Sequence, residues 1–158
     1  MTKTWITTSE KETRCLGETL ARELFPDGIL LLQGNLGIGK TVLAQGVARG
    51  LGIDPGQVQS PSFTLVRHHK GERADMIHID LYRLEVGEVE GIGIWEILES
   101  PGVKVVEWSE RLPLPVEQAL RIVIRAGSAP HERVFEALDR SVEQRKASAS
   151  VEYKGETG

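Results

Sequence analysis

The chain has 158 residues, one cysteine and a formal charge of −4, and this length predicts a single domain. One cysteine excludes an intramolecular disulfide and a cysteine-rich zinc site, and the acidic balance, without a cluster of lysines and arginines, argues against direct, tight binding of RNA or DNA. Because the apolar runs are too short for a membrane span and the N-terminus lacks a signal-peptide pattern, we expect a cytoplasmic protein.

The first predicted element is a helix near the N-terminus. Ser9 and Glu12 form the capping pattern S-x-x-E, and leucines then recur at every fourth position from 16 to 24. The sequence Pro26-Asp27-Gly28 ends this pattern. Cys15 precedes the first of these leucines, and we expect its thiol to be buried.

The next segment contains the most specific motif of the chain. An apolar run at 28–33 is followed at 34–41 by G-N-L-G-I-G-K-T, which matches the phosphate-binding pattern G-x-x-x-x-G-K-[ST] in full. A helical pattern continues over 42–48. A strand, a tight loop and a helix in this order are the setting in which the motif binds a nucleoside triphosphate, so we expect a nucleotide site here.

Each part of this loop has an expected contact. Its glycines let backbone N–H groups approach phosphate oxygens, and the start of the following helix adds partial positive charge. Lys40 is expected to reach the β- and γ-phosphates, and the Thr41 hydroxyl to bind Mg²⁺. The guanine-reading sequence N-K-x-D is absent, which favours ATP and ADP. The predicted nucleotide-binding residues of the loop are Gly34, Asn35, Leu36, Gly37, Ile38, Gly39, Lys40 and Thr41.

The remainder of the chain is predicted to alternate between strands, turns and one helix. Strand patterns occupy the later part of 60–66, then 76–80, 103–107 and 119–125, with a hairpin turn near 70–71. Residues 86–98 predict a helix despite three glycines, and 133–138 fit a strand or a helix equally well. From 139 onward the chain is polar without apolar periodicity. We therefore expect one phosphate-loop domain over 1–138 and a mobile tail over 139–158.

Two acidic residues end predicted strands. Asp80 ends the strand at 76–80 and Glu107 the strand at 103–107, while Gln33 leads from its strand into the phosphate loop. If these strands are parallel, their carboxyl ends meet at one sheet edge, where α/β proteins bind ligands. We therefore predict an α/β P-loop NTPase fold of three layers with a mainly parallel central sheet. Asp80 and Glu107 are the predicted catalytic residues, and together with Thr41 they are the predicted Mg²⁺ ligands.

Several residues near this edge also have a structural interpretation. Glu107 is compatible with a solvated strand end, and Asp80 with a turn or helix cap. His78 shares the face of Asp80 by strand alternation but equally fits a hydrogen-bonded core histidine, so the predicted catalytic set excludes it. Trp108 fits core packing, and Arg83 fits a phosphate ligand, a partner contact or a surface salt bridge.

Three further motifs follow the phosphate loop. They are S-P-S-F-T-L-V at 60–66, H-I-D-L-Y-R-L at 78–84 and V-E-W-S-E-R-L at 106–112. In this order they resemble the S-P-T-F-T-L-V, H-x-D-L-Y-R-L and I-E-W-x-E segments of the TsaE (YjeE) family of bacterial ATPases, which take part in making threonylcarbamoyladenosine on transfer RNA. The chain departs from the family pattern at Ser62, where threonine is commoner, and at 68–69, where two histidines replace a frequent acidic and aromatic pair.

The resemblance implies a Mg-dependent ATPase. Because the chain has no recognisable arginine finger, we expect its activity to be weak alone and stimulated by partners. In this family the ATPase associates with TsaB and TsaD, TsaD transfers the threonylcarbamoyl group to the adenosine beside the anticodon, and hydrolysis supports turnover. By this resemblance Lys40 and Thr41 hold phosphates and Mg²⁺, and Asp80 and Glu107 serve the metal or the attacking water. The 60–64 loop, including Thr64, senses the nucleotide, and Trp108 lies near it. Transfer RNA is contacted only indirectly through the complex, and no membrane is involved.

Two other classes of protein remain as alternatives. A phosphate loop followed by D-L-Y-R is compatible with a small-molecule kinase, but no insertion for an arginine-bearing lid or a second pocket is visible. A nucleotide-controlled binding module of the GTPase-switch kind is the third reading, and it lacks N-K-x-D. Release of phosphate from ATP alone, as opposed to phosphorylation of an acceptor, separates the ATPase from the kinase.

Overall fold

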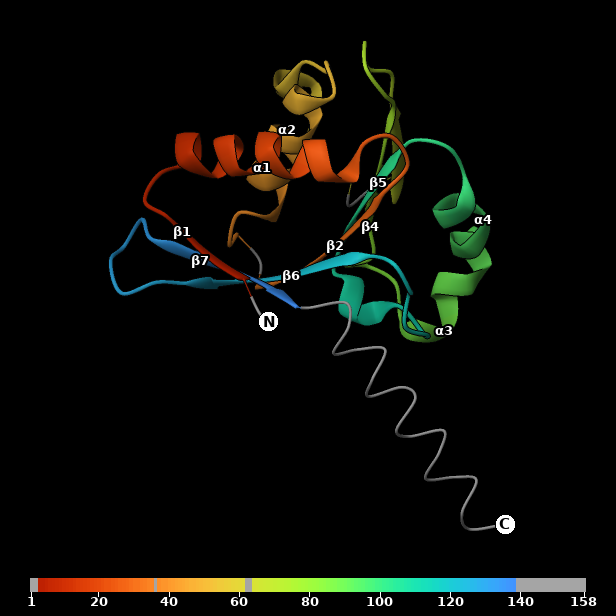
Figure 1. Ribbon diagram of the computed structural model, residues 1–158. Coiled ribbons are helices and arrows are strands. Elements are labelled where there is room, and N and C mark those ends of the chain that lie inside the picture. Colours follow the sequence, from red (N-terminus) through yellow and green to blue (C-terminus); the bar gives the residue numbers. More distant parts are fainter. Residues whose placement is uncertain (1–2, 36, 62–63, 139–158) are drawn as a thin grey trace, which may run out of the picture.

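The computed structural model describes residues 3–35, 37–61 and 64–138, which form a seven-stranded sheet between helices, in the strand order β1-β7-β6-β2-β5-β4-β3 (Figure 1). The strands are β1 (Lys3–Thr7), β2 (Ile29–Gln33), β3 (Val66–His69), β4 (Met76–Asp80), β5 (Val103–Glu107), β6 (Leu120–Ala126) and β7 (Arg133–Leu138). The α-helices are α1 (Glu10–Leu24), α2 (Lys40–Gly50), α3 (Val86–Val89) and α4 (Ile94–Glu99). Short 3₁₀ helices are η1 (Pro55–Gln57), η2 (Glu90–Ile92) and η3 (Ser109–Arg111).

The centre of the sheet is parallel and its edges are antiparallel. Strands β4, β5, β2 and β6 are parallel neighbours, whereas β3 runs antiparallel to β4, β7 to β6 and β1 to β7. The sheet is therefore mixed. The predicted α/β fold is confirmed, but the parallel strands are confined to the centre of the sheet. Connection length explains the antiparallel edges, because short turns such as those between β3 and β4 and between β6 and β7 join antiparallel strands, while parallel strands need a crossover.

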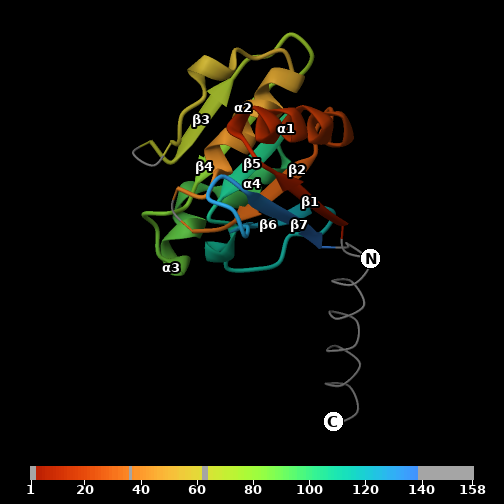
Figure 2. The same ribbon diagram turned by 90° about the vertical axis from the view of Figure 1, so that its left-hand side faces the viewer.

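Strand β2 separates two apolar cores. Leu30 and Leu32 are buried in the core that contains α1 and α2, whereas Leu31 packs in the core that contains α3 and α4. Successive side chains of a strand point to opposite faces, so one apolar strand can serve both cores. Both views show α1 and α2 together over one face of the sheet (Figures 1 and 2). The sheet thus lies between two helical layers, as predicted.

Helix α1 begins and ends where the sequence predicts. The Ser9 hydroxyl accepts a hydrogen bond from the Glu12 N–H at 3.1 Å, and the leucines at 16, 20 and 24 are buried. The prediction of a buried Cys15 is wrong, since this side chain is exposed. Adjacent residues of a helix do not share a face, so Cys15 turns away from the stripe that contains Leu16.

The predicted continuous helix over 86–98 is also wrong. The segment consists of α3, η2 and α4, and Gly93 separates the last two with a φ of 73°. This left-handed conformation cannot continue an α-helix and is one that glycine adopts at little cost. The composition of the segment is helical, but its backbone turns at one glycine.

The antiparallel edge of the sheet contains one segment whose structure the sequence left open, 133–138, and one strand that was not predicted, β1. Residues 133–138, which fit a strand or a helix, form β7 between β6 and β1. The hairpin predicted near 70–71 is confirmed by the pairing of β3 with β4. Strand β1 was not predicted, because only Thr7 of its five residues is buried and its apolar signal is weak.

The tail predicted over 139–158 lies outside the described residues. Within the described ranges, no helix is both long enough and apolar enough to cross a membrane.

Candidate functional site

The phosphate loop connects β2 to α2. Gly37 and Gly39 have φ values of 76° and 109°, in the left-handed region. A Cβ atom at either position would meet no atom within 4 Å, so glycine is required there by the backbone conformation and not by lack of space. Helix α2 begins directly after Gly39, which directs its first N–H groups toward the loop. The predicted loop residue Leu36 lies outside the described residues.

Lys40 is held by its own loop. Its side chain is buried, and Nζ donates hydrogen bonds to the carbonyl oxygens of Gly34 and Asn35. Nζ also lies 3.7 Å from the centre of the Trp108 ring. Burial lowers the pKa of Lys40, and the nearby carboxylates of Glu107, Glu110 and Asp80 oppose that shift. The ammonium group therefore occupies a partly desolvated position beside acids.

The parallel pairing of β4 with β5 places the two predicted catalytic acids side by side. Asp80 and Glu107 are register partners at the carboxyl ends of these strands, and both are buried. The Thr41 hydroxyl donates to Glu107, with Oγ1 at 3.2 Å from Oε1. The Ser60 hydroxyl donates to Asp80 Oδ2 at 2.6 Å. The loop, α2 and both acids thus meet at one sheet edge, as the strand order requires.

His78 extends this cluster into the core. It is completely buried, and its Nε2 atom hydrogen-bonds to Glu107 Oε2. His78 pairs with Val105, so the side chain of Glu107 lies two residues further along β5 on the same face. His78 was excluded from the predicted catalytic set, although its alternation with Asp80 was the available signal. The contact itself depends on strand pairing, which the sequence does not show.

Trp108 follows Glu107 directly and has a φ of 58°, which turns its ring over the site. The ring centre lies 4.9 Å from that of Tyr82, and the two planes are inclined by 42°. Trp108 also packs against the apolar core that contains α3 and α4, so it both contributes to core packing and lies near the phosphate loop. Together, Trp108 and Tyr82 form an aromatic wall beside Lys40.

These residues enclose a cavity of about 440 Å³, a volume in the range of small-molecule sites. Its lining includes the loop residues Gly37, Gly39, Lys40 and Thr41, both acids, Ser60, Tyr82, Arg83 and Trp108. Thr64, predicted to bind nucleotide, does not line the cavity, and its N–H and hydroxyl both donate to the Pro61 carbonyl. The segment that begins at Ser60 therefore reaches the site through Ser60 itself.

The donor set is compatible with Mg²⁺. Among the described residues, no three His, Cys, Asp or Glu side chains gather into a metal-binding group. Mg²⁺ typically keeps several waters and is bound by one or two carboxylates together with substrate phosphates. Thr41, Glu107 and Asp80 offer one hydroxyl and two carboxylates beside the phosphate loop, which fits that mode of binding.

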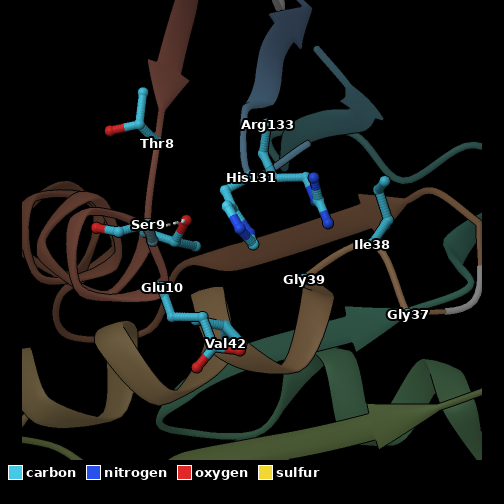
Figure 3. A pocket seen from close by; sticks show the side chains of 10 residues that line it. Thr8, Ser9, Glu10, Gly37, Ile38, Gly39, Val42, His131 and Arg133 are labelled. Atoms are coloured by element: carbon cyan, nitrogen blue, oxygen red, sulfur yellow. Dashed lines mark hydrogen bonds between the residues drawn. The ribbon is translucent and has the colours of Figure 1, made fainter. Parts of the chain in front are cut away.

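A second cavity, of about 380 Å³, lies against the same loop, and sequence reasoning missed it (Figure 3). It is bounded by the start of α1, by the loop, by His131 in the turn between β6 and β7 and by Arg133, the first residue of β7. Ile38, a predicted nucleotide-binding residue, lines this cavity. No single motif marks the site, because three segments distant in sequence form it.

Comparison with known proteins assigns the chain to a family. The family model described as "Threonylcarbamoyl adenosine biosynthesis protein TsaE" matches residues 7–135. A protein named "tRNA threonylcarbamoyladenosine biosynthesis protein TsaE" from Nostoc sp. is 38% identical over 131 residues, covering 80% of each chain. Its namesake from Bacillus subtilis is 35% identical over 141 residues, covering 88% of each chain.

A solved structure agrees with these sequence relatives. The crystal structure of YdiB from Bacillus subtilis is 28% identical to this chain and superposes with a TM-score of 0.70, covering 96% of both chains. The fold, the phosphate loop and the family model thus point to the same group of proteins. The chain belongs to the TsaE family.

Proposed function

We propose that this protein is a Mg-dependent ATP hydrolase that supports the formation of threonylcarbamoyladenosine at the adenosine beside the anticodon of tRNA, acting with TsaB and TsaD. The observation that carries the hydrolase assignment is the meeting of Lys40, Thr41 and two buried carboxylates in one cavity at the end of parallel strands. Family membership supports the tRNA-modification role. Because the chain is acidic, contact with tRNA is assigned to the complex and not to this protein.

The residues of the loop bind and orient the triphosphate. Lys40 exchanges its present acceptors, the carbonyls of Gly34 and Asn35, for β- and γ-phosphate oxygens, which are stronger acceptors for an ammonium group. The N–H groups at the start of α2 add partial positive charge at the same place. The result is a fixed γ-phosphate facing Asp80 and Glu107.

The two acids serve the metal and the attacking water. Thr41 lies within hydrogen-bonding distance of Glu107, so these two side chains are close enough to hold the same ion. Thr41, Glu107 and Asp80 would hold Mg²⁺, which would supply positive charge to stabilise the negative charge that develops on the phosphates. His78 holds Oε2 of Glu107 from inside the core and so restricts the carboxylate to one orientation.

The decisive experiment measures what becomes of the γ-phosphate. The isolated protein is incubated with Mg-ATP, and free phosphate is followed alongside phosphorylation of nucleoside and sugar-acid acceptors. Phosphate release that depends on Mg²⁺ and is abolished by EDTA supports the hydrolase. Phosphate transfer to an acceptor, without release in its absence, identifies a kinase instead and overturns the proposal.

A further inference from the structure

Two histidines on neighbouring strands have ring nitrogens that lie buried without a hydrogen-bond partner in the described part of the chain. They are Nδ1 of His78 on β4 and Nε2 of His69 on β3. Such atoms are uncommon, because a buried nitrogen that leaves water without gaining a partner costs free energy. Neither atom has a part in the proposed function, and His69 belongs to the histidine pair at 68–69 that departs from the family pattern.

Strand pairing places both rings on the same face of the sheet. In the antiparallel pair of β3 with β4, His69 lies opposite Met76, and Arg67 lies opposite His78. Because alternate residues of a strand share a face, the side chains of His69 and His78 are diagonal neighbours, a separation that aromatic side chains can span. Met76 is buried in the core that contains α1 and α2, so both histidines lie on that face.

The bond between His78 and Glu107 determines what the other nitrogen of His78 can do. An ionised carboxylate only accepts hydrogen bonds, so Nε2 of His78 carries the hydrogen in its bond to Glu107 Oε2. In the neutral ring, Nδ1 then has a lone pair that requires a donor. Arg67 lies across from His78, but its side chain is exposed, whereas Nε2 of His69 is buried. Its position therefore favours His69 as the donor.

The surroundings of His69 favour a neutral ring with a single N–H. Burial lowers the pKa of His69, and the charges of neighbouring groups, above all His78, act in the same direction. The side chain is only partly buried and stands at the end of an edge strand, and the χ2 torsion of a histidine has a broad range. A rotation of this ring can therefore direct Nε2–H toward Nδ1 of His78.

From this arrangement we infer that His69 is a positioning residue for ATP hydrolysis, whose Nε2–H donates to Nδ1 of His78 and so fixes the histidine that holds Glu107. With Nδ1 occupied as an acceptor, His78 keeps its hydrogen on Nε2, directed at the carboxylate. Thr41 donates to the same carboxylate from the other side. The inference rests on the proposed function and extends the site to β3, which lines neither of the two cavities described above.

Nitrogen-15 NMR of the histidine rings tests the hydrogen bond in the protein without nucleotide or metal. In the wild type, His78 should be the Nε2–H tautomer, with its Nδ1 resonance shifted upfield as in a hydrogen-bonded acceptor. His69→Phe keeps an aromatic ring but removes the N–H, so this resonance should move downfield to the position of a free nitrogen. His68→Phe is the matched control, because His68 is exposed and lies on the opposite face of β3. An unchanged His78 resonance in His69→Phe would overturn the inference.

The kinetics of Mg-ATP hydrolysis test what this bond does for the reaction. His69→Phe should lower kcat about fivefold, the effect of one ordinary hydrogen bond, and leave KM within about twofold of the wild type. His69→Gln, whose amide N–H can take the place of Nε2–H, should recover most of the loss, and His68→Phe should match the wild type. Circular dichroism establishes that each variant is folded.

A double variant separates an effect through His78 from a separate effect on stability. The kcat of His69→Phe combined with His78→Leu should equal that of His78→Leu alone, because a residue that acts through His78 has no effect once His78 is removed. Additive losses, or a wild-type kcat in His69→Phe, would overturn the inference. If the wild type itself released no phosphate from ATP, the proposed function would fail, whereas the NMR comparison would still decide whether His69 donates to His78. The two failures are therefore distinguishable.

Discussion

Lys40 occupies the position where a bound triphosphate would lie, buried against its own loop and the Trp108 ring. Lys40→Ala removes the cation that bridges β- and γ-phosphates, so ATP affinity should fall on the order of 100-fold, the value of a hydrogen bond to a charged group. Burial lowers the pKa of Lys40, so the charged amine is less favourable in the folded protein than in the unfolded chain. Because Lys40→Ala removes this unfavourable burial of charge, the variant should fold.

Calorimetric titration with Mg-ATP measures this change, and Lys11→Ala is the control because Lys11 is exposed on α1. Circular dichroism establishes that the variant is folded. A folded Lys40→Ala protein with unchanged ATP affinity would contradict the assignment of the loop.

Asp80 and Glu107 are expected to matter more for hydrolysis than for binding. Metal and water must be positioned chiefly in the transition state, so Asp80→Ala and Glu107→Ala should each lower kcat by about 100-fold or more. ADP affinity should stay within about tenfold of the wild type. Phosphate release and ADP titration are measured in parallel, with the exposed Glu117→Ala as control. Wild-type rates in both acid variants would mean that these carboxylates are structural.

His78 is expected to position Glu107 from the core side. His78→Leu removes the hydrogen bond to Oε2, while His78→Gln keeps an N–H donor near the same place. Loss of a partner that orients a metal-site carboxylate typically costs about 10- to 100-fold in activity. The Leu variant should show this loss in kcat with little change in ADP affinity, and the Gln variant should recover part of it. Equal kcat in the two variants, both well folded, would rule out a role through this hydrogen bond.

At the scale of elements, the segment from α3 to α4 depends on one glycine. Gly93 has a φ of 73°, a conformation that costs other residues roughly 1–2 kcal/mol, so Gly93→Ala should lower the free energy of unfolding by about that amount. Gly87 is the matched control, since it lies inside α3 and a Cβ there would meet nothing within 4 Å. Gly87→Ala should raise stability by about 0.4–1 kcal/mol.

Urea denaturation of both variants measures the difference. The two substitutions add the same methyl group six positions apart in sequence, so a difference in sign isolates backbone conformation from side-chain size. Equal effects would show that the left-handed turn at Gly93 carries no conformational cost.

At the scale of the whole molecule, the site is assembled from four elements, with β2 and α2 supplying the loop and β4 and β5 the acids. A phosphate-loop hydrolase gains about 10³- to 10⁵-fold from an arginine supplied by a partner, so the isolated protein should hydrolyse ATP slowly and TsaB with TsaD should accelerate it. The exposed side chains of Tyr82 and Ser60 border the cavity where such a partner would approach.

Reconstitution tests this prediction. ATPase rate and the amount of threonylcarbamoyladenosine on tRNA are measured over many cycles with and without this protein. Stimulated hydrolysis and a higher product yield are expected. Equal yield in its absence, together with no stimulation by TsaB and TsaD, would contradict the proposed role and favour the kinase.

Local features were predictable because they depend on residues close together in the chain. The phosphate loop, the cap of α1 at Ser9 and the acids that end β4 and β5 all follow from patterns spanning a few positions. The same reasoning failed where a single backbone angle overrides composition, as at Gly93, and where helix phase decides exposure, as at Cys15. Strand β1 was missed because an edge strand that is mostly exposed has a weak apolar pattern.

The sequence by itself determined which class of ligand to expect, since the glycines, Lys40 and Thr41 form a complete phosphate-loop motif whose predicted chemistry depends on adjacent residues. Only the tertiary structure decided which distant groups meet that loop. His78 bonds to Glu107 across 29 positions, and His131 reaches the loop from the turn between β6 and β7. Such contacts depend on strand order and register, which are set by the packing of whole apolar faces and therefore cannot be derived from any short segment.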